Sequence, residues 1–350
     1  MTTELTRALG EAGWDDVRLP NLEAAFELSE DCIQRARKHL ATELDGLDDR
    51  LDVVAFGSLA RREMTTASDL DWLVVVHALP EERSAVQAAL SAADGLRAVL
   101  SEVGDVRAPG SSGVFGQMVS AVELVEVIGL QADTNHSHTR RILLIEESVS
   151  LRDEAVHRQL LTTTFRRYLD AHPSARTGVP RFLLNDLLRY WRTVTVDYQA
   201  KSPARSMYSL RYLKLIVSRK LTFAASVLPL LALAEEGKQL SVDEFADLLY
   251  ETYSRPALVR FVSAAASLGA DHPELMTSAK QVLMIADQFN GLLGDQSWRD
   301  KIDEASRHDD AKEQDEFAAA HRLGRDLQGS LEEMFFAEPL LPLTRSLLVF

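Results

Sequence analysis

Residues 51–76, LDVVAFGSLARREMTTASDLDWLVVV, decide the fold of this chain. Leu51–Phe56 is a short apolar run with β-branched residues, and Trp72–Val76 is a second run of the same kind, so both predict buried strands. Gly57-Ser58 breaks the first run, and the helix-favouring residues 59–64 follow it. The pattern therefore predicts a strand, a Gly-Ser turn, a short helix and a second strand, in that order.

Two aspartates precede the second apolar run. Asp69 and Asp71 are two residues apart, so their side chains point to the same side of an extended strand. Two adjacent carboxylates repel each other, and a bound cation offsets that repulsion. Oxygen ligands of this kind suit Mg²⁺ or Mn²⁺ bridging to a substrate phosphate. Gly57 lets the backbone approach a phosphate, the Ser58 hydroxyl can bond it, and the following helix start favours anions.

This arrangement of Gly57-Ser58, a short helix and Asp69-x-Asp71 resembles the DNA polymerase β-like nucleotidyltransferase superfamily. The resemblance implies an α+β fold, with a small mixed sheet and its helices followed by a larger all-helical domain. It also implies an enzyme with two metal ions, which moves a nucleoside monophosphate from an NTP, ATP being favoured, to a hydroxyl acceptor. The competing interpretation is a Gly-Ser turn followed by an incidental acidic strand start.

The resemblance also implies a third carboxylate on the next strand, beyond one helix. Asp105 is the candidate that this order of elements offers, as a further metal ligand and as the group that helps to deprotonate the acceptor. Glu123 is the rival, but Ser120-x-x-Glu123 before an apolar run is typical of a helix capping box. Residues 104–125 are similar to a segment of the glutamine synthetase adenylyltransferases and the protein uridylyltransferases, which favours a protein acceptor.

Basic residues are the remaining candidates for nucleotide contacts. Arg61 or Arg62 would neutralise charge on the leaving pyrophosphate, although a surface helix also carries such residues. In related nucleotidyltransferases a helical domain contributes cations to the triphosphate, and Lys214, then Arg211, are the candidates here. A solvent-facing position on an amphipathic helix is an equally good interpretation of both.

The chain is expected to divide into three parts: a helical segment at 1–48, the nucleotidyltransferase domain at 49–150 and a helical domain at 151–350. Within the second part, Thr139 is expected to cap the helix that carries Arg140 and Arg141.

Charge and composition limit the partners. The formal net charge is −15, yet residues 151–220 hold 14 Lys or Arg against 5 Asp or Glu, a local charge of +9. This basic band suits a polyphosphate, an acidic partner or RNA, or it forms solvated helix faces. The single cysteine, Cys32, fits a reducing compartment, and residues 1–20 lack a signal-peptide pattern. The apolar stretch 221–234 is short for a membrane span, so we expect a cytoplasmic protein without a membrane partner.

Three function classes follow. The first is the nucleotidyltransferase, acting on a protein, a small molecule or an RNA end, or forming a cyclic nucleotide. The second is a nucleotide-binding regulator on the same fold without catalysis, and the third is a helical interaction protein. Metal-dependent NTP binding separates the third class from the other two, and pyrophosphate release separates the first from the second.

Overall fold

The computed structural model describes residues 2–47, 50–77, 83–104, 106–107, 114–170, 178–200, 208–236, 240–305 and 315–349. The chain forms two compact units, each made of separate segments. Unit 1 contains residues 1–24, 183–238 and 257–350, and unit 2 contains residues 25–182 and 239–256.

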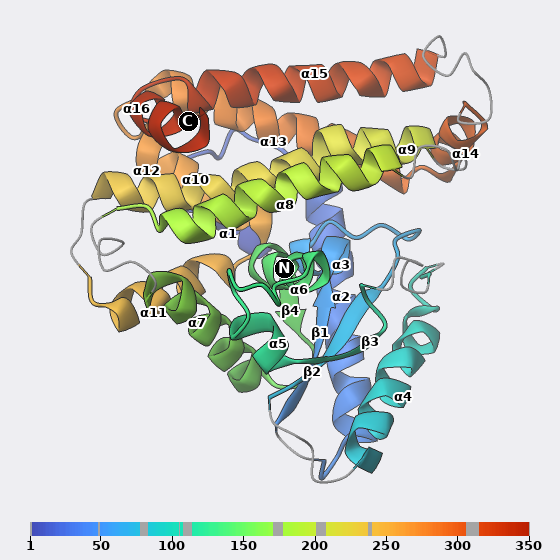
Figure 1. Cartoon of the computed structure of the whole chain (residues 1–350). Helices are drawn as coiled ribbons and strands as arrows, with labels where there is room; N and C mark the ends of the chain where they lie inside the picture. The colour runs from blue at the N-terminus through green and yellow to red at the C-terminus, as the bar shows by residue number, and fades with distance from the viewer. Residues whose placement is uncertain are drawn as a thin grey trace. The chain divides into compact units, whose positions relative to one another are not determined.

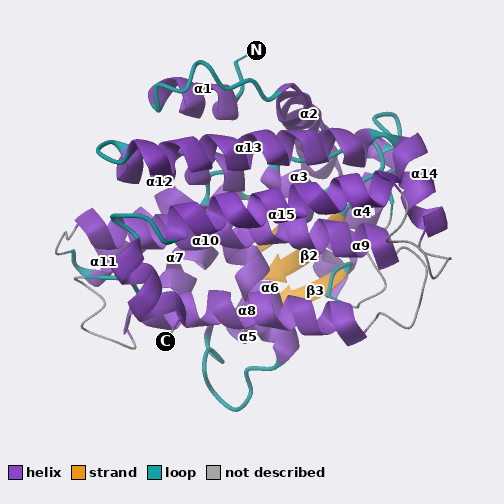
Figure 2. Cartoon of the chain, turned by 90° about the horizontal axis from the view of Figure 1, so that it is seen from above, coloured by secondary structure: helices purple, strands orange, loops and turns teal. Residues whose placement is uncertain are grey.

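Unit 2 contains a four-stranded mixed sheet, built from β1 (Leu51–Phe56), β2 (Asp71–Val76), β3 (Gln117–Ser120) and β4 (Ser148–Ser150). The strand order is β3-β2-β1-β4 (Figure 1). β1 pairs antiparallel with both β2 and β4, and β2 pairs parallel with β3. A small mixed sheet accompanied by a large helical region confirms the predicted α+β class, and Figure 2 shows helices as the main secondary structure.

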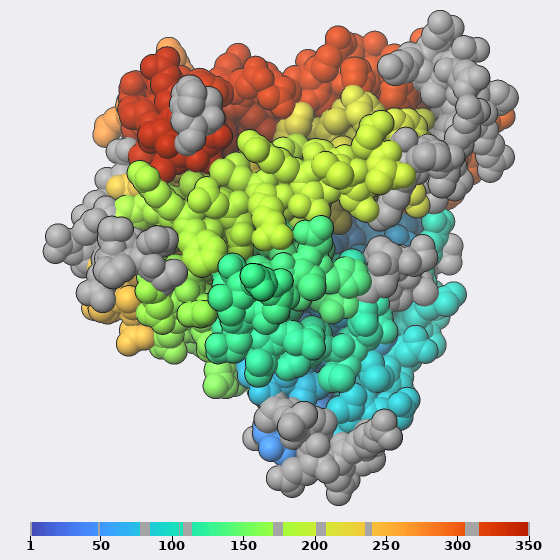
Figure 3. Space-filling view, viewed as in Figure 1, coloured from blue at the N-terminus to red at the C-terminus, as the bar shows by residue number. Residues whose placement is uncertain are grey.

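Helices complete unit 2. They are the greater part of α2 (Pro20–Glu43), then α3 (Gly57–Arg61), α4 (Arg83–Leu100), α5 (Ala121–Val125), α6 (Asn135–Glu146), α7 (Glu154–Asp170) and α11 (Val242–Tyr253). α2 and α4 bury one face of the sheet, where alternate residues of β1 and β2, such as Val53 and Trp72, join one apolar core. The segment 114–150, green in Figure 3, forms the surface in front of the strands.

Unit 1 is helical throughout its described residues. It contains α1 (Glu4–Glu11), the start of α2, α8 (Arg181–Ala200), α9 (Tyr208–Lys214), the π-helical turn η2 (Leu215–Arg219), α10 (Lys220–Glu236), α12 (Ala257–Gly269), α13 (Pro273–Gly294), α14 (Gln296–Ala305), α15 (Asp315–Phe335), α16 (Leu341–Leu343) and a second π-helical segment, η4 (Thr344–Val349). The continuous helix 208–234 is long and apolar enough to cross a membrane by length and composition, and its most apolar stretch is 67% buried. Such burial is also typical of the core helix of a soluble protein.

Pro229 interrupts the hydrogen bonding of α10, and Arg260 from α12 compensates for it. Proline has no backbone N–H, so the carbonyl of Ala225, four residues earlier, loses its helical donor. The Arg260 side chain is 2% exposed, and its Nε donates to the Ala225 oxygen at 3.0 Å. Its Nη2 also donates to Ser226 Oγ at 3.1 Å. The buried arginine therefore satisfies backbone that the proline leaves unpaired.

The Arg260→Met variant is expected to lower the free energy of unfolding by about 2 kcal/mol, because a buried carbonyl loses its donor. Urea unfolding of the full chain measures this loss. Pro229→Ala restores an N–H at the position that reaches Ala225, so the same arginine replacement should cost less in that background. An equal loss in both backgrounds would show that Arg260 acts through other contacts.

Two expectations differ from the observed elements. The expected boundary at residue 150 falls inside unit 2, because α7 packs on α11 there and Arg166 Nε pairs with Asp243 at 2.8 Å. The helix that carries Arg140 and Arg141 begins at Asn135, so the prediction that Thr139 caps it is wrong. Thr134 is the cap, and its hydroxyl accepts the Ser137 N–H at 3.1 Å.

Candidate metal and phosphate site

The turn after β1 lies directly against the first residue of β2. Phe56 and Asp71 are paired residues of the antiparallel ladder, so Gly57 leaves the sheet beside Asp71. Gly57 has φ +69°, a conformation that other residues rarely adopt. A Cβ added there would lie 3.4 Å from Asp71 Oδ2. Glycine therefore leaves open the space between the turn and the carboxylate, and half-buried Ser58 follows in the same turn.

Asp69 and Asp71 lie on the side of the strand away from the α2 and α4 core. They alternate with Leu70 and Trp72, which are both buried in that core. Asp69 is exposed and Asp71 is partly exposed, so both carboxylates can be reached from solvent. The structure thus places Gly57 beside Asp71, with Ser58 next to Gly57 in the turn and Asp69 on the same side as Asp71; the binding roles expected of all four stay predictions.

Arg107 joins this group, although the sequence assigned it no role. It forms an isolated parallel bridge with Asp69: Leu70 N donates to the Arg107 oxygen at 3.0 Å, and Arg107 N donates to the Ser68 oxygen at 3.3 Å. Residues opposite each other in a ladder place their side chains on the same face, so Arg107 and Asp69 are neighbours there. The Asp-x-Arg pattern at residues 105–107 is the feature of the sequence that could have indicated Arg107.

The third carboxylate expected from the sequence is Asp105, which lies outside the described residues. Its rival Glu123 is exposed on the short helix α5, where Ser120 Oγ accepts the Val122 N–H at 3.3 Å. In the described part of the chain, no three or more His, Cys, Asp or Glu side chains are grouped closely enough to hold a metal ion.

The two arginines that follow the turn are held in ion pairs. Arg61 is 7% exposed; its Nε donates to Glu63 at 2.9 Å, and its Nη1 donates to the buried Glu147. Arg62 Nε pairs with Glu30 at 2.6 Å. The Arg61 guanidinium thus binds two protein carboxylates, and this geometry gives no support to its expected role at the pyrophosphate.

Lys214 and Arg211 belong to unit 1, whereas the glycine turn and the aspartates belong to unit 2. Arg211 is exposed on α9, and Lys214 is half-buried where α9 meets the π-helical turn. Their expected contact with the triphosphate stays a prediction.

The residues present suit a divalent cation bound to phosphate. Asp69 and Asp71 supply the hard oxygen donors that Mg²⁺ and Mn²⁺ prefer. The open space at Gly57, next to Asp71 Oδ2, is where a side chain would otherwise stand. The site therefore offers carboxylates on one side and accessible backbone on the other.

Comparison with protein families agrees with this geometry. Residues 2–144 match the family model described as "Putative nucleotidyltransferase DUF294". No curated protein and no solved structure matches the chain. This match is limited to residues 2–144, and it supports the resemblance of that part of the chain to the DNA polymerase β-like nucleotidyltransferase superfamily. The family match supports nucleotidyl transfer as the general activity, while the finer likeness to the adenylyl- and uridylyltransferases stays a prediction.

Proposed function

We propose that this protein uses Mg²⁺ or Mn²⁺ to transfer a nucleoside monophosphate from an NTP to a hydroxyl group. ATP is the favoured donor, and a protein side chain is the favoured acceptor. The observation that carries the proposal is the position of Gly57, whose missing side chain leaves space directly beside Asp71 Oδ2. A phosphate can approach the backbone in that space while it stays close to the carboxylates.

Each residue has a defined role in this proposal. Asp69, Asp71 and Asp105 hold the metal ions, which supply positive charge to the triphosphate when bound. The Ser58 hydroxyl donates to a phosphate oxygen. Asp105 accepts the proton of the incoming hydroxyl, whose oxygen attacks the α-phosphorus while the bond to the β-phosphate breaks and pyrophosphate leaves. Lys214 and Arg211 remain the proposed cations of the helical region.

A cytoplasmic location is part of the same proposal. Cys32 is fully buried, and burial raises the pKa of its thiol to about 11, so it behaves as a packing residue. A free, unreactive cysteine suits a reducing compartment, where NTPs are also abundant.

Transfer of labelled α-phosphate from each of the four NTPs tests the proposal. The assay measures pyrophosphate release and the label on proteins, RNA and small molecules of bacterial lysate, with Mg²⁺, with Mn²⁺ and with chelator. Label on protein supports the proposed protein acceptor. Label on RNA or on small molecules instead would identify that class of molecule as the acceptor. Binding of an NTP without release would favour the regulator class.

Replacing Gly57 by alanine should reduce both stability and NTP binding. An alanine at φ +69° costs about 1–2 kcal/mol, and its methyl group enters the space beside Asp71. Gly46→Ala is the matched control, because Gly46 has φ +71° and no atom within 4 Å of an added Cβ. Thermal unfolding should show a similar loss for both variants, and titration with NTP should show weaker binding only for Gly57→Ala. Equal NTP affinity in the two variants would remove the turn from the phosphate site.

A further inference from the structure

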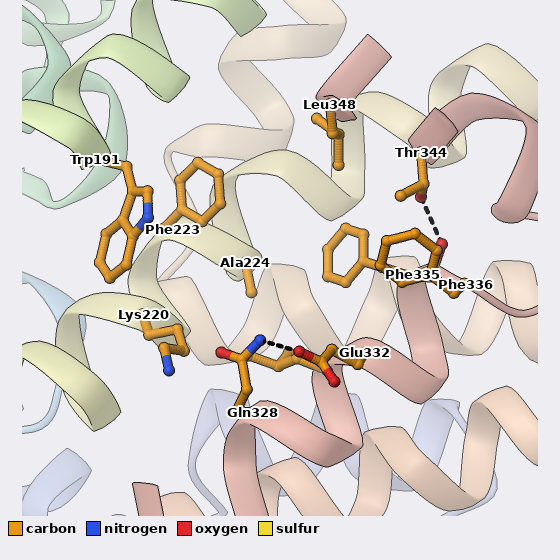
Figure 4. A pocket seen from close by; sticks show the side chains of 11 residues that line it. Trp191, Lys220, Phe223, Ala224, Gln328, Glu332, Phe335, Phe336, Thr344 and Leu348 are labelled. Carbon is orange, nitrogen blue, oxygen red and sulfur yellow. Dashed lines mark hydrogen bonds between the residues drawn. The ribbon is translucent and has the colours of Figure 1, made fainter. Parts of the chain in front are cut away.

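A cavity of about 230 Å³ lies among the helices of unit 1, and none of the residues that line it was assigned a role above. Its walls come from α8, α10, α15 and η4 (Figure 4). The lining is mostly apolar and aromatic, with a few polar groups. This is the usual composition of a small-molecule site, and the volume falls just below the range of about 300–1,000 Å³ typical of such pockets. The cavity therefore suits a ligand with one ring or one branched chain.

Aromatic rings form two walls of the cavity. Trp191 and Phe223 stack with their ring centroids 5.4 Å apart and their planes 20° apart. Phe335 and Phe336 stand on the other side, where Phe336 is 49% exposed. Thr344 fixes this second wall, since its Oγ1 donates to the Phe335 oxygen at 2.5 Å. Covering exposed aromatic surface in a concave site with an apolar group lowers the free energy of binding.

The π-helical turn places Lys220 and Phe223 on the cavity side. A π turn contains one residue more than an α turn, so it rotates the following side chains by about 100° relative to an uninterrupted helix. Gly324 on α15 allows this wider turn to pack closely, because an added Cβ would clash with Ile216 Cδ1. The π-helical turn thus determines which side chains at the start of α10 face the cavity, namely Lys220 and Phe223.

Among the described residues that line the cavity, Lys220 is the only cation. Burial lowers the pKa of its ammonium group, and the Glu332 carboxylate opposes that shift only in part. Glu332 itself accepts a hydrogen bond from Gln328 Nε2 at 2.6 Å. A half-buried ammonium group gains from an anionic partner, whereas Glu332 disfavours a ligand with two negative charges.

We propose that this cavity binds a small organic monocarboxylate with an aromatic or branched apolar body. The body lies between the aromatic walls, and the carboxylate accepts hydrogen bonds from Lys220 Nζ. The proposed ligand does not depend on nucleotidyl transfer, because none of the described lining residues has a role in that reaction.

Titration calorimetry of the full chain with 3-phenylpropanoate tests the proposal without any nucleotide. We expect saturable binding at one site. The neutral 3-phenylpropan-1-ol, the cationic 2-phenylethylamine and the dianionic phenyl phosphate should each bind about tenfold more weakly, because they lose the charge-assisted bond or meet repulsion. Lys220→Met should weaken 3-phenylpropanoate binding by a similar factor, and Ala224→Leu should block it by filling the cavity.

Arg325→Gln is the control for loss of one positive charge, because Arg325 is exposed on α15 and does not line the cavity. Circular dichroism establishes whether each variant is folded. If Ala224→Leu does not fold, the affinity of Lys220→Met for 3-phenylpropanoate is the test of the site. The proposal is overturned if the wild-type chain shows no saturable binding, if the alcohol or the amine binds as well as the carboxylate, or if Lys220→Met leaves the affinity unchanged.

Discussion

Replacing Asp71 by asparagine is expected to lower nucleotidyl transfer by at least about a thousandfold. Metal ligands contribute several kcal/mol of transition-state stabilisation, and each 1.36 kcal/mol corresponds to about tenfold in rate. Asp71 has the better-defined position of the two strand carboxylates, because its Oδ2 faces the Gly57 turn. Asparagine keeps the size of the side chain and one oxygen donor but removes the charge that binds a divalent cation.

The same replacement should leave the fold intact or stabilise it. Asp69 and Asp71 share one face of the strand, so removing one charge relieves their repulsion when no metal is bound. Pyrophosphate release and thermal unfolding, measured on the same preparations, separate loss of chemistry from loss of structure. Asp94→Asn is the matched control, since Asp94 is exposed on α4. Full activity of Asp71→Asn would mean that the Asp-x-Asp strand does not bind the catalytic metal.

Replacing Arg61 by methionine is expected to reduce the free energy of unfolding by about 3–5 kcal/mol, because two carboxylates lose a buried cation that pairs with both. Glu147 is buried, and Glu63 is nearly so. Chemical unfolding measures the loss. A second replacement, Glu147→Gln, should recover part of the loss by removing a buried negative charge that Arg61 no longer offsets.

Arg62→Met provides the comparison for Arg61. The Arg62 partner, Glu30, is 41% exposed, and such pairs contribute about 1 kcal/mol or less. If Arg61 instead neutralises the pyrophosphate, Arg61→Met should keep its stability and show a raised KM for the NTP. The two measurements therefore decide between a structural role and a nucleotide-binding role.

Strands β1 and β2 and the glycine turn between them could be predicted because their determinants are local. Apolar runs flanked by Gly57 and by Asp69-x-Asp71 lie within 26 consecutive residues, whereas the antiparallel pairing of Phe56 with Asp71 is seen only in the structure. The role of Arg61 could not be read in the same way. Its partner Glu147 is 86 residues away in the sequence, and an arginine after a turn has the same appearance whether it is buried or exposed.

Two other features that could not be predicted from the sequence also depend on distant segments. Arg107 pairs with Asp69 through an isolated β-bridge outside the strands, and Arg260 reaches Ala225 from another helix. Thr134 and Thr139 have the same capping chemistry, so composition alone does not choose between them. The helix starts at the earlier threonine, and its later residue Arg141 is fully buried, pairing with Asp133 at 2.8 Å.

The order of segments in the two units bears on how the chain folds during its synthesis. The chain passes between the units four times, after residues 24, 182, 238 and 256. Unit 2 lacks α11 until the ribosome has reached residue 256, so the face of α7 that packs on α11 stays uncovered while more than 80 further residues are made. Proteins usually fold domain by domain from the N-terminus, and transiently exposed apolar surface promotes aggregation. A nascent chain of this protein therefore presents an uncovered face of α7 that chaperones can recognise, and a fragment ending near residue 182 would keep that face exposed permanently.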